Sequence, residues 1–160
     1  MEPCDLLKNI VIIEGEKQEK IRGTYCSSFA KVDDDGYRRN IDTRHKYSDG
    51  YCYNGYLWDY LIDPIVSDER SLMAAIKELK SIYVLWDIHS HEKIFIKDYW
   101  KFGKECILLL DSSMLIQYLH LLPEDIYIFD ESYTWTIIFT HEYIDDDRYC
   151  LKAGTSLNKG

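Results

Sequence analysis

Short apolar runs separated by charged or turn-forming residues recur along this chain, and the last third shows them most clearly. From Trp135 to Thr140, large apolar side chains alternate with threonine and isoleucine at the period of two that is typical of a β-strand. The run "DIYIFD" at 125–130 predicts a strand before it, and "ESYT" at 131–134 predicts the turn. The sequence therefore predicts a β-hairpin over residues 125–143.

Further elements follow from the same kind of pattern. We expect strands at 81–88, 93–97 and 106–111, and a last edge strand at 148–154. Helical spacing and capping residues predict helices at 55–63, at 67–79 with Ser67 as N-cap, and at 111–122 beginning at Asp111. Residues 3–13 fit a short helix or a strand, and the remainder of residues 1–50 is expected to be rich in loops. Residues 31–55, with two Asp-Gly pairs, fit loops or a hairpin.

This order of elements predicts one domain over residues 1–160. Its length of 160 residues lies close to the commonest domain size. Strands that follow one another by short turns favour an antiparallel or mixed sheet. We therefore expect an α+β fold with a single mixed or antiparallel sheet and helices packed on one face.

The composition argues against a membrane-spanning or secreted protein. No apolar run approaches the roughly 20 residues needed to span a bilayer, and the first residues lack the features of a signal peptide. The 5 cysteines form no CxxC pair and are widely spaced. We expect reduced thiols, a cytoplasmic location and no membrane partner.

Acidic residues give the chain a formal net charge of −9. This charge disfavours direct binding to nucleic acid and favours a basic partner, although it also fits a role in solubility alone. Segment 124–147 carries eight carboxylates and no lysine or arginine. Because they fall mainly at strand ends and turns, we expect two acidic rims of the sheet, formed by Asp130, Glu131, Asp145, Asp146 and Asp147. A solvated loop at an exposed edge remains the alternative for the three consecutive aspartates.

Three histidines offer an enzymatic alternative. His89 and His91, two residues apart, could bind zinc with His141 or Asp87 as a third ligand and support a zinc-dependent hydrolase that uses His89, His91 and His141. The run "HSHE" resembles the "HSHP" of the JAMM metalloproteases, but Glu92 replaces the proline and the downstream Ser-x-x-Asp is absent. His141 also fits a packed residue at the end of a strand, with Glu142 on the opposite face. The sequence contains no phosphate-binding glycine loop or G-x-S-x-G motif, and it predicts no cofactor.

Two stretches resemble immunity proteins. "LPEDIYIFDESYTWTIIFTHEY", which follows a helix that opens with "DSS", is similar to the C-terminal half of small immunity proteins of bacterial polymorphic toxin systems. This likeness covers about residues 105–153. "YLWDYL" at 56–61 resembles the "LWD" helix of barstar, an acidic immunity protein that blocks a ribonuclease.

The resemblance implies a protein without catalysis that binds one toxin domain tightly. It places Trp58, Asp59 and Asp63 on a docking helix, with Tyr56, Tyr60 and Trp135 as candidate aromatic anchors. Trp135 also fits a core residue. The leading hypothesis is therefore an immunity or inhibitor protein that occludes a basic toxin, and an acidic mimic of nucleic acid is a third possibility. The sequence does not determine the oligomeric state.

Overall fold

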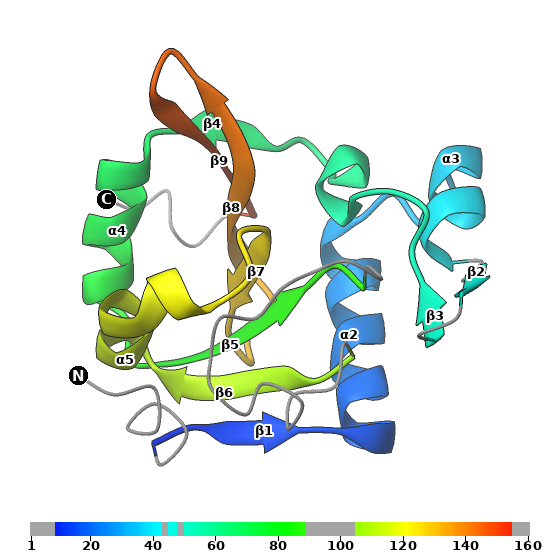
Figure 1. Ribbon diagram of the computed structural model, residues 1–160, viewed down its shortest axis with the longest axis horizontal. Coiled ribbons are helices and arrows are strands. Elements are labelled where there is room, and N and C mark those ends of the chain that lie inside the picture. The colour runs from blue at the N-terminus through cyan, green and yellow to red at the C-terminus, as the bar shows by residue number, and fades with distance from the viewer. Residues whose placement is uncertain (1–8, 43–44, 48–49, 89–104, 155–160) are drawn as a thin grey trace.

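The computed structural model describes residues 9–42, 45–47, 50–88 and 105–154. One antiparallel sheet of seven strands runs through the centre in the order β1-β6-β5-β7-β8-β9-β4 (Figure 1). A separate two-stranded ribbon pairs β2 with β3. The strands are β1 (Val11–Ile13), β2 (His45–Tyr47), β3 (Gly50–Cys52), β4 (Ile65–Ser67), β5 (Ser81–Trp86), β6 (Ile107–Asp111), β7 (Ile126–Phe129), β8 (Trp135–Ile144) and β9 (Asp147–Gly154). The predicted α+β class with a single antiparallel main sheet is confirmed.

Helices and helical turns lie between these strands. They are α2 (Gly15–Phe29), α3 (Asp35–Tyr37), the π-helical turn η1 (Arg38–Asp42), the 3-10 turn η2 (Leu57–Tyr60), α4 (Glu69–Lys77), α5 (Ser112–Tyr118) and the 3-10 turn η4 (Leu119–Leu121). The helix predicted at 67–79 is α4, and its N-cap is Asp68 rather than Ser67, since the Asp68 side chain accepts from Ser71 N. The helix predicted at 111–122 is α5 followed by η4, and the helix predicted at 55–63 is reduced to η2.

The strand predictions hold with one change of position. Strands β5, β6, β7 and β8 lie where the apolar patterns place them. The strand predicted at 148–154 is β9, but it is not an edge, because β4 pairs with it and forms the margin of the sheet. In the ambiguous segment 3–13, residues Val11–Ile13 form β1, which pairs with β6. The strand predicted at 93–97 falls outside the described residues.

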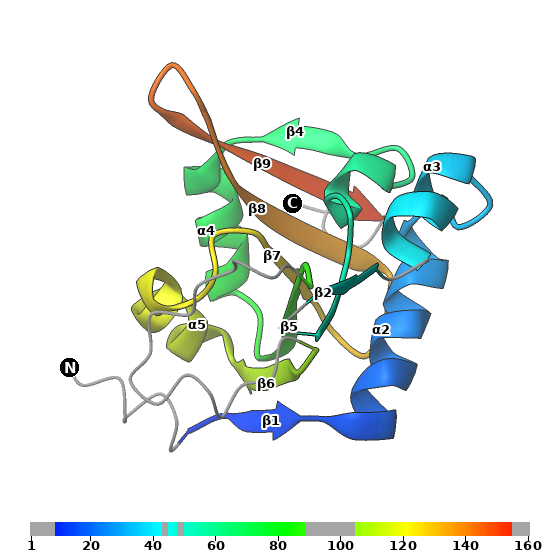
Figure 2. The same cartoon turned by 45° about the vertical axis from the view of Figure 1, so that its right-hand side comes forward.

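Helices cover both faces of the sheet, and the prediction of a single covered face is wrong. On one face, Val84 and Trp86 pack with Leu72 of α4 and Leu115 of α5. On the other face, the residues that alternate with them, such as Leu85, pack under α2. Figure 2 shows α2 on the opposite side of the sheet from α4 and α5. Because the central strands are apolar on both sides, a single covered face would leave the other in water.

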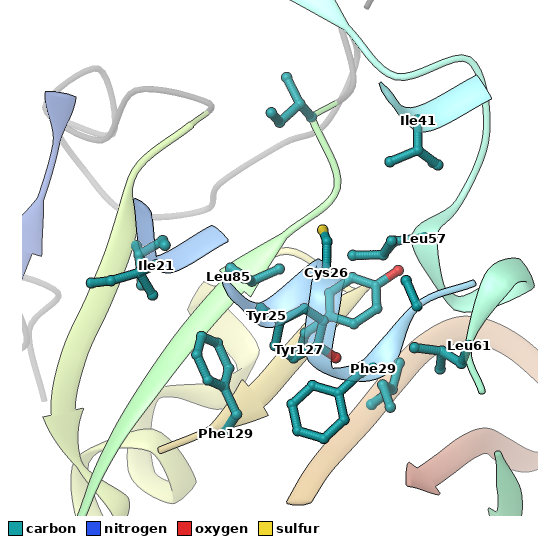
Figure 3. Packing of buried hydrophobic residues seen from close by; sticks show 14 of the residues in the cluster. Ile21, Tyr25, Cys26, Phe29, Ile41, Leu57, Leu61, Leu85, Tyr127 and Phe129 are labelled. Carbon is teal, nitrogen blue, oxygen red and sulfur yellow. The ribbon is translucent and has the colours of Figure 1, made fainter. Parts of the chain in front are cut away.

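Helix α2 corrects the expectation that residues 1–50 are rich in loops. Its buried positions follow helical spacing and are Gln18, Ile21, Arg22, Tyr25, Cys26 and Phe29. Two of the six are strongly polar, so a hydropathy pattern does not show a continuous apolar face on this helix. Tyr25 is the centre of the contact with the sheet, and its ring lies 4.7 Å from that of Phe129 (Figure 3). Its hydroxyl lies 2.8 Å from Thr136 Oγ1.

Strands β8 and β9 form a long hairpin whose tip projects beyond the rest of the molecule in both overall views (Figures 1 and 2). Ile144 pairs with Asp147, so the loop contains two residues, Asp145 and Asp146. Both have positive φ, 51° and 70°, as a type I′ turn requires. Aspartate tolerates this left-handed conformation better than most residues, but Asn-Gly fits it best.

The turn gives the first prediction. Replacing Asp145→Asn together with Asp146→Gly is expected to raise the free energy of unfolding by about 1 kcal/mol, because the new pair adopts the left-handed conformation at lower cost. Urea denaturation measures the change. The pair Asp145→Ala with Asp146→Ala removes the same charge without favouring positive φ, and it is expected to destabilise. An equal gain from both pairs would show that charge repulsion governs the stability of the turn.

Candidate functional site

The η2 turn is fixed to the sheet by a buried polar pair, Asp87 and Tyr127. Asp87 Oδ1 accepts from the backbone N–H of Leu57 at 2.8 Å, and Tyr127 Oη donates to Asp87 Oδ2 at 2.7 Å. Tyr127 Oη in turn accepts from the backbone N–H of Trp58 at 2.9 Å. Two backbone donors at the start of the turn thus find partners in the sheet, so η2 is held in one position.

Burial sets the protonation of this pair. Loss of solvation raises the pKa of the Asp87 carboxyl to about 8, although hydrogen bonds from Leu57 and Tyr127 act to lower it. Burial also raises the pKa of the Tyr127 hydroxyl well above its ordinary value. At neutral pH, Asp87 is therefore mostly an uncharged acid.

Aromatic rings connect η2 to strands β8 and β9. Tyr56 stacks on Trp58 with ring centroids 5.3 Å apart, and it also lies 5.1 Å from the ring of His141. Trp58 meets Tyr149 edge-on at 5.9 Å. The indole N–H of Trp58 is buried and has no hydrogen-bond partner among the described residues. Tyr56 and Trp58, both predicted as binding residues, thus form one partly exposed aromatic cluster with His141.

A bulge in β8 changes the expected alternation of His141 and Glu142. The register shifts between Phe139 and Tyr143, so the residues between them do not follow a regular period of two. His141 contacts Tyr56, and the negative charge of Glu142 contributes to the raised pKa of Asp59, after the larger effect of burial. Counting by twos therefore does not assign faces to His141 and Glu142, and His141 lies beside the η2 segment through its contact with Tyr56.

The bulge is fixed by Asp125, which the sequence did not single out as a site residue. Its buried carboxylate accepts from the backbone N–H of His141 at 2.9 Å and contacts His141 Nδ1 at 2.9 Å. Burial lowers the pKa of His141, but the hydrogen bond and charge of Asp125 outweigh it, so the net shift is upward. A carboxylate that orients an imidazole is also the arrangement of a general base, which needs a nucleophile beside it.

Arg148 stabilises the bulge from the other side. Its Nε donates to the Thr140 carbonyl at 2.8 Å, Nη2 donates to the Glu124 carbonyl at 2.6 Å, and Nη1 reaches Glu69 at 3.4 Å. Sequence reasoning missed this role. The one available signal is that Arg148 is the first basic residue after the acidic segment 124–147.

Cys106 and Cys150 are poor candidates for a nucleophile. Cys106 and Cys150 are buried, and the loss of solvation raises the pKa of each thiol to about 12. Such thiols stay protonated at neutral pH and do not supply a thiolate.

The structure divides the predicted acidic residues into two groups. Asp145, Asp146 and Asp147 lie at the tip of the β8–β9 hairpin, where Glu142 is close in sequence. Asp130 and Glu131 lie in the turn before β8, which is ten residues long, so roughly 30 Å of strand separates them from the tip. The expected acidic rims are therefore two separate places, at opposite ends of β8.

Exposed apolar side chains accompany the acidic group at the hairpin. Tyr143 and Ile144 are each 59% exposed, and on the adjoining edge strand β4, Ile65 is 50% and Val66 62% exposed. We call the region at the tip the hairpin surface, and it consists of Asp59, Glu142, Tyr143, Ile144, Asp145, Asp146 and Asp147. Ile65 and Val66 pair with Lys152 and Leu151 of β9, farther from the tip. Within the described parts of the chain, none of the carboxylates of the hairpin surface forms an ion pair.

Two of the predicted anchors lie elsewhere. Trp135 is 3% exposed and belongs to the core under α4 and α5, as the alternative reading of this residue expected. Tyr60 accepts from Asn40 Nδ2 at 2.6 Å and packs edge-on against Tyr37, so it joins η2 to α3. Asp63 follows η2 and has a positive φ of 44°.

The zinc hypothesis is only partly covered by the described residues. His89 and His91 lie outside them, and His141 contacts Asp125. In residues 9–42, 45–47, 50–88 and 105–154, no group of three or more histidine, cysteine or acidic side chains could hold a metal ion. The same residues contain no helix with the length and apolar character needed to cross a bilayer.

Comparison of the chain with protein-family models, with curated proteins and with solved structures finds no match. The geometry of the site must therefore support any functional proposal by itself.

Proposed function

We propose that this chain is an inhibitor of the immunity type, which binds and occludes a basic toxin domain through the hairpin surface. The observation that carries the proposal is the combination of exposed apolar side chains with carboxylates that form no ion pair within the described parts of the chain. Apolar side chains supply binding free energy once a partner buries them. Carboxylates around them attract a cationic partner and exclude acidic ones.

The aromatic cluster beside this surface supports the proposal. Asp87 and Tyr127 hold η2, and Asp125 holds the bulge, so that Trp58 and His141 are fixed before any partner arrives. A surface fixed in advance loses less conformational entropy on binding. The buried indole N–H of Trp58 lacks an acceptor among the described residues, so a small local shift on binding would let a partner's carbonyl supply one.

In this role the chain acts in the cytoplasm beside its toxin and needs no cofactor. The basic residue nearest in sequence to the tip, Arg148, is engaged with Thr140 and Glu124 carbonyls and with Glu69. It therefore does not neutralise the hairpin carboxylates directly.

The test measures binding to the protein encoded next to this chain. The variant Asp145→Asn, Asp146→Asn, Asp147→Asn removes three charges at the tip and is expected to slow association by about tenfold at low salt, because electrostatic steering is reduced. Stopped-flow or surface-based kinetics at two salt concentrations give the rate constants.

The opposite end of β8 offers a matched control. Asp130→Asn with Glu131→Gln also removes acidic charge, but about 30 Å from the tip, and it is expected to change the association rate by less than about twofold. Equal effects at both ends would show that net charge, not the hairpin surface, directs binding. Competition by double-stranded DNA for the same partner would instead favour a mimic of nucleic acid.

A further inference from the structure

Arg22 is a buried cation that forms no ion pair among the described residues. It lies in the middle of α2 and is 2% exposed. Nη1 donates to Tyr53 Oη at 3.2 Å and to the Trp86 carbonyl at 3.0 Å, and Nη2 donates to the Glu105 carbonyl at 3.5 Å. All three acceptors are uncharged. Among the described residues, no carboxylate forms an ion pair with Arg22.

The hydrogen-bonding capacity of Arg22 is also incomplete. A guanidinium has five N–H donors, and the three hydrogen bonds above leave Nε without a partner in the described part of the chain. Asp87, which interacts with Arg22 electrostatically, is mostly protonated at neutral pH for the reasons given above. A buried arginine is normally paired with an anion, because an isolated charge is costly to remove from water.

A cavity lies beside Arg22. Its volume is about 430 Å³, and Arg22 forms part of its wall together with the apolar or aromatic side chains of Val32, Tyr37 and Ile41. Glu19 and Asp42 also line it, and both are exposed. The cavity therefore combines one buried cation, an apolar wall and two acidic side chains in contact with solvent.

We propose that this cavity binds a small organic carboxylate, whose carboxylate oxygens accept hydrogen bonds from Arg22 and whose apolar part lies against Val32, Tyr37 and Ile41. A planar carboxylate matches the planar donor set of a guanidinium. Glu19 and Asp42 disfavour ligands with two or more negative charges, so inorganic phosphate fits the cavity less well. The site lies on α2, away from the hairpin surface, and is independent of the proposed inhibitory function.

The test uses benzoate as the probe and follows amide chemical shifts of the full chain by NMR. Benzoate is expected to bind saturably to the wild-type protein, with benzyl alcohol and inorganic phosphate at least about tenfold weaker. Arg22→Met is expected to weaken benzoate binding by at least about tenfold, while Arg38→Met, an exposed arginine outside the cavity, is expected to leave it unchanged.

A second variant keeps the test decisive if Arg22→Met fails to fold. Val32→Trp is expected to fill the cavity from its partly exposed wall, keep Arg22, and reduce benzoate binding to a similar extent. Absence of saturable benzoate binding, or benzoate binding that both variants retain, would overturn the proposal. Binding of phosphate as tight as that of benzoate would show that the ligand class is wrong.

Discussion

Replacing Phe129→Ala is expected to lower the free energy of unfolding by about 3–5 kcal/mol, the usual cost of deleting a buried aromatic side chain. Phe129 is fully buried on β7, and its ring lies 4.7 Å from Tyr25 of α2 and 5.4 Å from Tyr83 of β5. The variant removes a side chain that packs between α2 and the sheet. Chemical denaturation followed by circular dichroism measures the change.

This result tests whether α2 covers the second face of the sheet. Val66→Ala on the edge strand also removes apolar atoms, but Val66 is largely exposed, so a change within about 0.5 kcal/mol is expected. If Phe129→Ala were as mild as this control, α2 would not pack as described. Loss of protection from hydrogen exchange along α2 in Phe129→Ala would locate the effect.

The second large effect concerns Asp87 and pH. Burial raises the pKa of this carboxyl to about 8 in the folded chain, whereas it is near 3.9 in an unfolded one. Between these values the folded protein holds a proton that the unfolded protein has lost. The contribution of Asp87 to the free energy of unfolding is therefore fully present below about pH 4. Above that pH it decreases by up to about 1.4 kcal/mol per pH unit, and it is lost once the pH passes about 8.

Asp87→Asn isolates this contribution, because asparagine can accept from Leu57 N–H and donate to Tyr127 without titrating. The stability of the variant relative to the wild type is expected to increase from pH 5 to pH 8 and to remain constant above that. Urea denaturation at each pH gives the two curves. A difference that does not vary between pH 5 and pH 8 would mean that Asp87 is ionised in the folded protein.

Patterns local in sequence predicted much of this fold. Strands β5, β6, β7 and β8 contain consecutive apolar residues, and helix α5 starts directly after Asp111, as its sequence predicts. Helix α2 was missed because Gln18 and Arg22 occupy buried positions on its inner face. The position of β4 was missed because a three-residue strand of exposed side chains has no pattern of its own and depends on β9.

The sequence predicted the charged residues of the candidate site, but not the buried residues that hold them in place. Sequence reasoning selected Asp59 and the three tip aspartates, since an acidic run is visible without a structure. It considered Asp87 only as an alternative zinc ligand and missed Asp125, although both are buried carboxylates. Their partners, Leu57 and His141, lie 30 and 16 residues away along the chain, and such pairing cannot be derived from spacing. The bulge that moves His141 and Glu142 was hidden for the same reason.

Both margins of the sheet join distant parts of the chain. Val11 of β1 pairs with Leu109, and Val66 of β4 pairs with Leu151. During synthesis on the ribosome, β1 and β4 emerge long before the strands that complete them. Early intermediates must therefore keep these segments from pairing with other chains, and final closure of the sheet waits for the last strand to leave the exit tunnel.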